Sequence, residues 1–546
     1  MMEAPRSDAS TSDRFFWAGV VALAVFVRVW GLGTYPLGAA EAEVASRAWQ
    51  ALGGHNPDPG LGGWLTPWVA VVFFFAAPTA FWARWISALV GGLLPLLARA
   101  WQPIGGRGWA RALAVGWALD PALIAASRLA WGPAVGIGLV GAAWTAYRRG
   151  YGAWALLLAL VALATGPAAG WALLVLLAVA FWEPRPRTWR LSDVGGALVV
   201  AGLLLTTVGL AYPAGLGGWA GGLVAWWHGW WAHDGVPAEA AAFYLGPILL
   251  WALWGAYRAR LQHDLPLAGV TLSAAALVAG LWLVYPARQA ADLAWITFVL
   301  WPWVAAAWAE ARWEHWVASK GGWLLAAGWL LLAAFAFLSA LAPNLGSTPS
   351  WLWIFLLALT GVTAVLIALL VAGWFGRAAL RHGAALALGG ITAFWFGIAL
   401  SHAFPAAASH EFWQRDAVAW DVRHLEDTLT WWGNRLTRGA AQDLSGVLLV
   451  DHPSLRWLQA KSFPGLEPRL ALMPGEHPWV VITKVGFNLE GTYRGQRYRL
   501  RETPRLASAR AWVDWFVYRG VAEENVDYIV LWLRNDAFAS PSAGAP

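Results

Sequence analysis

The sequence predicts an all-α membrane domain with many spans, followed by a small α/β domain on the outer side of the membrane. Of its 546 residues, 59% are hydrophobic and only 12% are charged, about half the charged fraction of a soluble protein. Apolar runs long enough to cross a bilayer recur between Phe15 and Phe404. After Pro405, charged residues become frequent and the apolar runs shorten to strand length.

We predict about thirteen spans, each close to the roughly 17–25 residues that a bilayer requires. They lie near residues 15–32, 84–100, 109–127, 130–147, 152–166, 167–183, 194–213, 242–257, 265–285, 291–309, 321–341, 351–373 and 383–403. The membrane domain therefore covers residues 15–404, after a short polar N-terminus, residues 1–14. Because the first run contains Arg28 and lacks a small-residue cleavage site, we expect a retained span rather than a signal peptide.

The apolar run 64–81 could also cross the membrane, but the distribution of arginines argues against a full span. Counting it would put Arg99, Arg107 and Arg111 outside and would invert every later loop. Since basic residues are retained on the cytoplasmic side, we predict a re-entrant or interfacial segment within a long first outer loop, residues 33–83. The chain is then a multi-pass plasma-membrane protein with a cytoplasmic N-terminus and an extracytoplasmic C-terminal domain.

Residues 405–536 are predicted to form the outer domain, and residues 537–546 a disordered tail. Strand-length apolar runs alternate there with helical patterns, as in an α/β domain. The predicted strands are 447–450, 479–483 and 528–532, and the predicted helices are 416–436 and 507–519. The sequence of this domain contains no glycine-rich phosphate loop, zinc-protease motif or serine-hydrolase motif.

Composition also excludes several kinds of chemistry. The absence of cysteine excludes disulfides, thiol catalysis and Cys-ligated metal. The net charge of +6 comes from arginines spread over many loops, which argues against a nucleic-acid partner. His228, His233 and Asp234 share a tryptophan-rich loop whose spacing suits an interfacial aromatic belt better than a metal site. The sequence leaves metal dependence open.

Two carboxylates, Glu41 and Glu43, follow the first span at the start of a helical pattern over residues 40–52. Helical residues two apart point about 200° away from each other, so the two acids should not share one site. A carboxylate beside a membrane cavity can act as general base toward an acceptor hydroxyl. The alternative is a pair of solvated acids that interact with the helix dipole. The spacing leaves both interpretations open.

Four further ionisable residues lie near membrane depth, namely Asp120, Arg128, Arg288 and Asp292. Such residues are costly in a bilayer and usually have a partner or a role. Arg288 and Asp292 are four positions apart and could form a structural ion pair. Alternatively, Arg128 or Arg288 binds a lipid phosphate, a task that suits the planar array of guanidinium donors.

The order of short motifs along the chain resembles a known family. In the N-terminal half the motifs are Arg28-Val-Trp-Gly-Leu, Pro36-Leu37, the acidic pair, a span that begins with Arg84, Asp120-Pro121 and Ser127-Arg128. Later motifs are Arg288 to Asp292-Leu-Ala-Trp295, Pro453-Ser-Leu-Arg-Trp-Leu458, Tyr493 to Leu500 and Ile529 to Asp536. This order resembles the GT-C superfamily of polyprenyl-phosphate-sugar glycosyltransferases, of the protein O-mannosyltransferase and lipid A aminoarabinose-transferase kind. It is most similar to their bacterial and archaeal flippase-activity-associated branch.

The resemblance implies an inverting transfer of a sugar from a polyprenyl-phosphate carrier to a glycan, lipid or protein acceptor at the outer face. In the family the first outer loop carries Asp-Glu, with the Asp as base, whereas this chain reads Ala40-Glu41. We therefore expect Glu41 as base, with Glu43 close by and Asp120 as a second acid. Arg128 and Arg288, with Asp292 beside the latter, are expected to bind the lipid phosphate. The carrier supplies an activated bond, so no nucleotide cofactor is implied.

Two departures from the family pattern support an alternative function. Position 40 lacks the Asp, and the acid that usually follows the Ser-Arg turn is replaced by Trp131-Gly132-Pro133. A non-catalytic glycolipid-binding or flippase-accessory protein would keep the fold without these acids. A secondary transporter is a third and weaker interpretation, because it predicts inverted repeats and the sequence shows no such symmetry.

Overall fold

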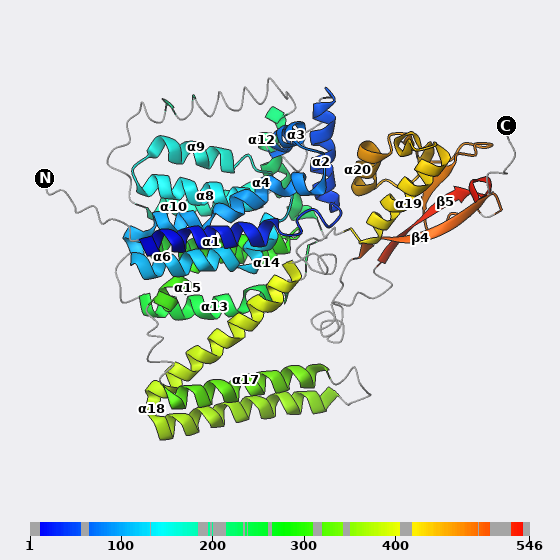
Figure 1. Ribbon diagram of the computed structural model, residues 1–546. Helices are drawn as coiled ribbons and strands as arrows, with labels where there is room; N and C mark the ends of the chain where they lie inside the picture. The colour runs from blue at the N-terminus through cyan, green and yellow to red at the C-terminus, as the bar shows by residue number, and fades with distance from the viewer. Residues whose placement is uncertain are drawn as a thin grey trace.

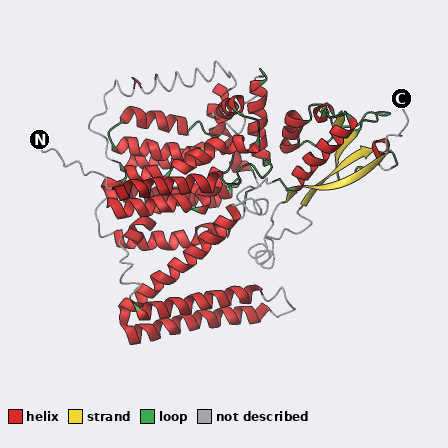
Figure 2. Cartoon of the chain, in the orientation of Figure 1, coloured by secondary structure: helices red, strands yellow, loops and turns green. Residues whose placement is uncertain are grey.

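The computed structural model describes residues 11–55, 65–131, 133–166, 168–183, 195–196, 199, 215–232, 235–236, 239–259, 265–309, 319–341, 350–403, 418–489, 491–502 and 526–538. A helical bundle and a smaller sheet-containing domain make up the molecule (Figures 1 and 2). The α-helices of the bundle are α1 (Thr11–Val29), α2 (Ala39–Leu52), α3 (Leu65–Phe75), α4 (Ala80–Leu93), α5 (Pro95–Ala100), α6 (Gln102–Leu119), α7 (Pro121–Ser127), α8 (Pro133–Arg148), α9 (Gly152–Ala162), α10 (Ala169–Trp182), α12 (Gly215–His228), α13 (Glu239–Ala259), α14 (Leu265–Val284), α15 (Leu293–Ala309), α17 (Lys320–Leu341) and α18 (Ser350–Ala403).

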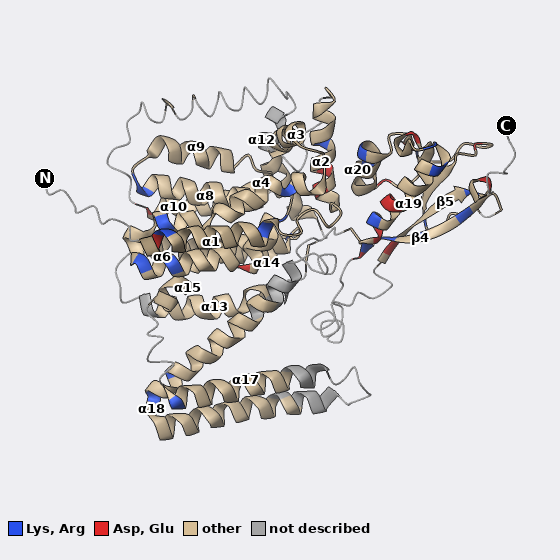
Figure 3. Cartoon of the chain, in the orientation of Figure 1, with Lys and Arg blue, Asp and Glu red and all other residues tan. Residues whose placement is uncertain are grey.

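The bundle has two ends, which we name by α1. The basal end is where α1 begins, and the distal end is where α1 finishes and beyond which the C-terminal domain lies (Figure 1). Many basic residues of the bundle gather at the basal end (Figure 3). This distribution agrees with the positive-inside argument, while the orientation of the termini across a membrane stays a prediction.

Four described helical segments are long and apolar enough to cross a membrane: Ala80–Ala100, Leu267–Val284, Ala290–Ala309 and Ala358–Phe394. Helices also occupy the other predicted spans, except 194–213, of which only residues 195, 196 and 199 are described. The protein is thus a mostly helical, multi-pass membrane protein, and the number of thirteen spans stays a prediction. The helix α1 begins at Thr11, so its first residues belong to the polar segment 1–14, and the boundary of that segment stays a prediction.

Four predicted spans differ from single, separate helices. The span 84–100 is built from α4 and α5, and the span 109–127 is divided at Asp120 between α6 and α7. The last two predicted spans lie in one helical segment, α18, which turns sharply at Gly376, where φ is 80°. Only glycine adopts such a conformation readily.

The core of the bundle is built around α15. In its apolar window 94% of the residues are buried, and it packs against α6, α13 and α14. Buried indoles fill the space between these helices, and two of them bond to the backbone of α15: Trp109 donates to the Pro302 carbonyl at 2.9 Å and Trp117 to the Phe298 carbonyl at 3.3 Å. An α-helix that is apolar on all sides is expected at such a position.

The first outer loop holds α2 and α3 at the distal end (Figure 1). The helix α2 agrees with the predicted helical pattern to within a residue. The helix α3 has 11 residues, which corresponds to about 16 Å, roughly half the thickness of a bilayer core. A full span over residues 64–81 is therefore not seen among the described residues of this segment, and the assignment as a re-entrant or interfacial segment fits its length.

The C-terminal domain contains a five-stranded mixed sheet in the order β2-β1-β3-β5-β4. Its elements are α19 (Asp421–Leu436), β1 (Gly446–Leu448), α20 (Pro453–Ser462), β2 (Leu466–Pro468), β3 (Val480–Lys484), β4 (Tyr493–Glu502) and β5 (Val526–Arg534). The strand β1 is parallel to β2 and β3, whereas β5 is antiparallel to β3 and β4. Alternate residues of β3 face opposite sides, so Val480 and Ile482 pack with α19 and α20, and Val481 packs with Trp532.

Two sequence predictions for this domain need correction. The strands β2 and β4 were not predicted, because β4 contains four arginines and lacks an apolar alternation. The boundary at residue 537 is also too early, because Ala537 is buried and the Phe538 ring packs 4.8 Å from that of Trp432. The predicted helix 507–519 and the tail from residue 539 lie outside the described residues.

The C-terminal domain is docked on the first outer loop. The Trp457 ring of α20 stacks on Phe73 of α3 with a centroid distance of 5.8 Å. The Ser454 hydroxyl donates to the Leu37 carbonyl at 3.0 Å, and Arg423 donates to the Thr34 carbonyl at 2.8 Å. These contacts connect residues about 400 positions apart and bring the C-terminal domain against the residues that the sequence selects as a site.

Candidate functional site

The centre of the distal end is a buried ion pair between Glu41 of α2 and Arg84 of α4. The Arg84 Nε lies 2.8 Å from Oε1 of Glu41, and Nη2 lies 2.6 Å from Oε2. Both side chains are almost completely buried, with 2% and 3% of their surface exposed. A bidentate pair of this kind fixes geometry as well as charge.

Arg84 also holds the chain segment that precedes α2. Its Nη1 donates to the carbonyls of Leu32 and Tyr35, and Nη2 donates to that of Pro36, at 2.9–3.2 Å. Together with the two bonds to Glu41, all five guanidinium N–H groups have a partner. The sequence identifies Arg84 only as the first residue of a predicted span. The signal that could have identified it is that a buried acid requires a cationic partner.

Glu41 has no free oxygen in this arrangement. Besides Arg84, it accepts from the Gly38 amide at 3.0 Å and from the Ala130 amide at 2.8 Å. These four bonds use the four acceptor positions of a carboxylate. The side chain therefore joins α2, α4 and the turn after Ser127, and it cannot accept a proton from a substrate while these contacts are in place.

Glu43 lies on a different face of α2. One third of its side chain is exposed, at 30%, and it pairs with Arg47 at 2.5 Å, four positions later. The Nη1 atom of Arg47 is buried and has no hydrogen-bond partner among the described residues. As the helical spacing predicts, the two acids do not share one site.

Asp120 belongs to the packed interior and not to the surface of the distal end. Its Oδ1 accepts from the Leu123 amide at 2.7 Å, which caps α7, and from Thr297 at 3.2 Å. Its Oδ2 accepts from the Trp301 indole at 2.8 Å. The carboxylate is completely buried and hydrogen-bonded to α15. A substrate therefore cannot reach it in this arrangement, which argues against its expected role as a second catalytic acid.

Arg128 closes the end of α1. Its Nη1 donates to the carbonyls of Val27, Arg28 and Trp30 at 2.8–3.2 Å. Its Nε and Nη2 have no hydrogen-bond partner among the described residues. Arg128 also lies within electrostatic range of Arg84 and Glu41, so it contributes positive charge beside the buried pair.

Arg288 and Asp292 form no ion pair with each other within the part of the chain that the structure describes. Arg288 donates to the carbonyl of Val236 at 2.7 Å and to those of Leu283 and Tyr285 at 3.2 and 3.3 Å. Asp292 is buried and accepts from the Gln289 amide at 3.0 Å. In place of the ion pair that the sequence leaves open, each of the two side chains is hydrogen-bonded to the backbone.

A cavity of about 340 Å³ lies between the outer loop and the C-terminal domain, and we call it the seam cavity. One wall is the segment Gly33–Leu37, whose carbonyls Arg84 holds, and the other is formed by α19 and α20. Its charged lining residues are Arg423, Glu426, Asp427 and Lys461. Asp427 has no hydrogen-bond or ion-pair partner among the described residues. The volume is within the range of small-molecule sites.

No group of three or more His, Cys, Asp or Glu side chains among the described residues could hold a metal ion. Of the histidine loop, His228 is described and exposed, whereas His233 and Asp234 lie outside the described residues. The structure therefore neither assigns a metal ligand nor tests metal dependence.

No protein-family model matches the sequence, and no curated protein is similar to it in sequence. Among solved structures, the chain is similar to ArnT from Cupriavidus metallidurans bound to undecaprenyl phosphate. The TM-score is 0.57 at 13% sequence identity, covering 98% of this chain and 100% of that one. For the apo state of the same ArnT, the TM-score is 0.56 at 14% identity, with coverage of 95% and 98%.

The chain therefore shares the fold of ArnT over nearly its whole length. This finding confirms, at the level of the fold, the resemblance to GT-C proteins that the order of motifs indicates. The narrower resemblance to the flippase-activity-associated branch stays a prediction.

Proposed function

We propose that the protein is a membrane glycosyltransferase that moves a sugar from a polyprenyl-phosphate carrier to an acceptor hydroxyl at the distal end. The observation that supports this function is the fold shared with ArnT, whose crystal structure contains undecaprenyl phosphate. In the reaction, the acceptor oxygen attacks the anomeric carbon and its proton passes to a base. The bond from that carbon to phosphate breaks, and the carrier phosphate leaves with the electron pair. A single displacement of this kind inverts the anomeric centre.

We assign the base to Glu43 rather than to Glu41. In the family that the sequence resembles, the base corresponds to position 40, which is alanine here. Residues three apart share a helix face, so Glu43 presents a carboxylate on the face of Ala40, and both positions are partly exposed. Its bond to Arg47 is a partly exposed i,i+4 pair, which is worth only about 0.3–0.5 kcal/mol. A substrate hydroxyl can therefore replace Arg47 as a hydrogen-bond partner of Glu43. Glu41 offers no such opportunity, because all four of its acceptor positions are used by buried hydrogen bonds.

Two arginines support binding of the carrier phosphate, Arg47, which pairs with Glu43, and Arg128, which lies within electrostatic range of Glu41 and Arg84. The buried Nη1 of Arg47 has no hydrogen-bond partner among the described residues. The Nε and Nη2 atoms of Arg128 also have no hydrogen-bond partner among these residues. Phosphate oxygens satisfy such donors well, and they stabilise the charge that develops as the carrier leaves. Arg288, at the start of the turn to α15, is a further candidate for the same task. Glu41 and Arg84 act as positioning residues, because they fix α2 relative to the turn after Ser127.

The seam cavity is our candidate for the acceptor. Its lining offers donors from Arg423 and Lys461 and an exposed acceptor from Asp427. Hydroxyl-rich ligands need this mixture of donors and acceptors. The identity of the acceptor, whether glycan, lipid or protein, is left for experiment.

The test is sugar transfer by purified protein in lipid nanodiscs, with a panel of polyprenyl-phosphate sugars. We expect Glu43→Gln to lower transfer by about 100-fold or more, since a general base contributes at least that much, with unchanged affinity for undecaprenyl phosphate. In the Glu43→Gln background, Ala40→Asp should restore transfer, because it returns a carboxylate to the same helix face. The exposed Asp443→Asn serves as the matched control and should be fully active. Full activity of Glu43→Gln would remove Glu43 from the mechanism.

A second function, glycolipid binding without catalysis, is favoured by one specific observation. The family base is absent at position 40, and the neighbouring Glu41 is saturated by four hydrogen bonds. If the native protein transfers no sugar but binds a donor, and Ala40→Asp alone gains transfer, this function becomes the better description. Transfer by the native protein contradicts it.

A further inference from the structure

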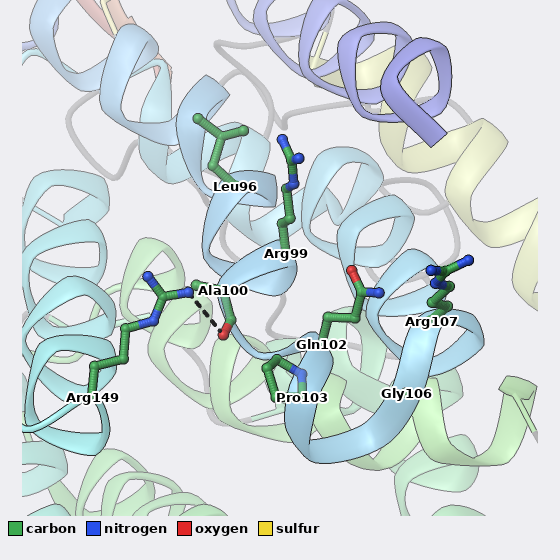
Figure 4. A pocket seen from close by; sticks show the side chains of 8 residues that line it. All are labelled: Leu96, Arg99, Ala100, Gln102, Pro103, Gly106, Arg107 and Arg149. Carbon is green, nitrogen blue, oxygen red and sulfur yellow. Dashed lines mark hydrogen bonds between the residues drawn. The ribbon is translucent and has the colours of Figure 1, made fainter. Parts of the chain in front are cut away.

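A second cavity lies at the basal end, far from Glu43 and the seam cavity. It has a volume of about 540 Å³ and opens where α5 ends and α6 begins (Figure 4). Three arginines line it, Arg99 from α5, Arg107 from α6 and Arg149 from the end of α8. No acidic residue is among its lining residues. We call it the basal cavity.

The three arginines differ from their neighbours because none of them forms an ion pair with a described acidic residue. Other arginines of this end are neutralised, since Arg111 pairs with Asp13 at 2.8 Å and Arg148 pairs with Glu183 at 2.6 Å. In contrast, Arg99 and Arg107 have no ion-pair or hydrogen-bond partner among the described residues. Arg149 makes one bond, to the Ala100 carbonyl at 3.3 Å, which holds it at the rim (Figure 4).

Asp13 is within electrostatic range of Arg107, but its hydrogen bond and ion pair are with Arg111. The cavity therefore concentrates three positive charges without neutralising them. Like charges held together repel one another, so an anion that enters the cavity is stabilised by all three.

The cavity has a rigid frame. The Trp101 indole donates to Thr145 at 2.7 Å, which joins the α5–α6 corner to α8, and Trp109 is anchored on the Pro302 carbonyl at 2.9 Å. The corner itself turns at Gly106, where φ is 80°, a conformation that glycine adopts without strain. Arginines carried by such a frame are pre-organised for a ligand.

We propose that the basal cavity binds the phosphate group of an anionic ligand, either a phospholipid head group or a soluble phosphate. The guanidinium groups match phosphate geometry, and the Gln102 side chain adds a polar group to the lining. Leu96 and Pro103 line the cavity beside the charges. Leu96 is 42% exposed, so an apolar surface continues from the cavity, which suits the glycerol and acyl parts of a lipid. This site is independent of the proposed sugar transfer.

The test is native mass spectrometry of the full chain in detergent with three probes: dioctanoyl phosphatidylglycerol, dioctanoyl phosphatidylcholine and inorganic phosphate. We expect phosphatidylglycerol to bind, with affinity about tenfold or more lower in the double variant Arg99→Gln/Arg107→Gln. The matched control is Arg14→Gln/Arg377→Gln, which removes two exposed arginines outside the cavity. It should change affinity by less than about twofold.

A charge-retaining variant keeps the test independent of folding. Arg99→Lys/Arg107→Lys should recover much of the binding that the glutamine variant loses, because the ammonium groups keep the positive charge, and should remain below the native chain, because they lack the planar donor array. Inorganic phosphate that binds as tightly as phosphatidylglycerol, with the same loss in the glutamine variant, supports the site with a soluble ligand as its source. Equal losses in the glutamine variant and the Arg14/Arg377 control overturn the proposal, because general charge then explains binding. A native chain that retains neither anion overturns it as well.

Discussion

Glu41 and Glu43 are two positions apart, yet their environments give them different tasks. Glu41 is buried and holds three chain segments together through Arg84, Gly38 and Ala130. Glu43 is partly exposed and has one partner in its own helix. The cause is the helical rotation of about 200° between them. Chemistry that needs an accessible carboxylate therefore belongs to Glu43, and the geometry of the site depends on Glu41.

The buried pair can be tested by comparing two arginines that each pair with a glutamate of α2. We expect Arg84→Gln to lower the free energy of unfolding by about 3–5 kcal/mol, because it leaves a buried carboxylate without its partner. Arg47→Gln, which breaks a partly exposed pair, should cost no more than about 1 kcal/mol. Unfolding in detergent micelles measures both. Equal stabilities of the two variants would contradict a structural role for Arg84.

At the scale of the element, arginines from neighbouring segments cap helix ends. Arg28 donates to the Trp117 and Ala118 carbonyls at the end of α6, and Arg128 does the same for α1. The last carbonyls of a helix have no partner within the helix, and in a low-dielectric environment an unpaired carbonyl is costly. Each of these arginines therefore caps the end of one helix and, by the same hydrogen bonds, holds that helix against a distant segment of the chain.

The break in α18 provides a prediction at the same scale. Because φ is 80° and ψ is 169° at Gly376, Gly376→Ala should destabilise the protein by about 1–3 kcal/mol. Gly373 lies one turn earlier in regular helix with nothing within 4 Å of its added Cβ. Gly373→Ala should then be neutral or stabilising by up to about 1 kcal/mol. The measurement is thermal unfolding of both variants in one detergent, and a stable Gly376→Ala would show that the break is not required.

At the scale of the whole molecule, the outer domain completes the distal end. Its helices α19 and α20 form one wall of the seam cavity, and the segment Gly33–Leu37 forms the other. The segment is itself held by Arg84, which also holds Glu41. The buried pair, the segment Gly33–Leu37 and the seam cavity are thus connected by direct contacts through Arg84.

Docking of the outer domain depends on Trp457, which is 7% exposed and stacks on Phe73. We expect Trp457→Ala to loosen the interface, since removing a buried tryptophan costs about 3–5 kcal/mol. Hydrogen exchange of α3 should then become about tenfold faster or more. Trp431→Ala is the control, because Trp431 is 55% exposed and should leave α3 protected. Unchanged exchange in the Trp457 variant would mean that other contacts carry the docking.

The sequence by itself determined the fold class, a helical membrane domain followed by a small α/β domain. It could do so because composition and the periodicity of apolar residues are local signals. Apolar runs predicted the helices of the bundle, and the acidic pair predicted α2 to within a residue. The change of composition after Pro405 predicted the outer domain. The strand β4 escaped prediction because its alternation is mostly polar and its identity comes from pairing with β5.

Only the tertiary structure decided which charged residues share a site. Glu41 meets Arg84 across 43 positions and Ala130 across 89, and Asp120 meets Trp301 across 181. No periodicity connects residues at such separations, so the sequence could propose a buried acid but not its partner. The physical reason is that burial makes an unpaired charge costly, and the packing of distant helices, not local sequence, supplies the partner that removes this cost.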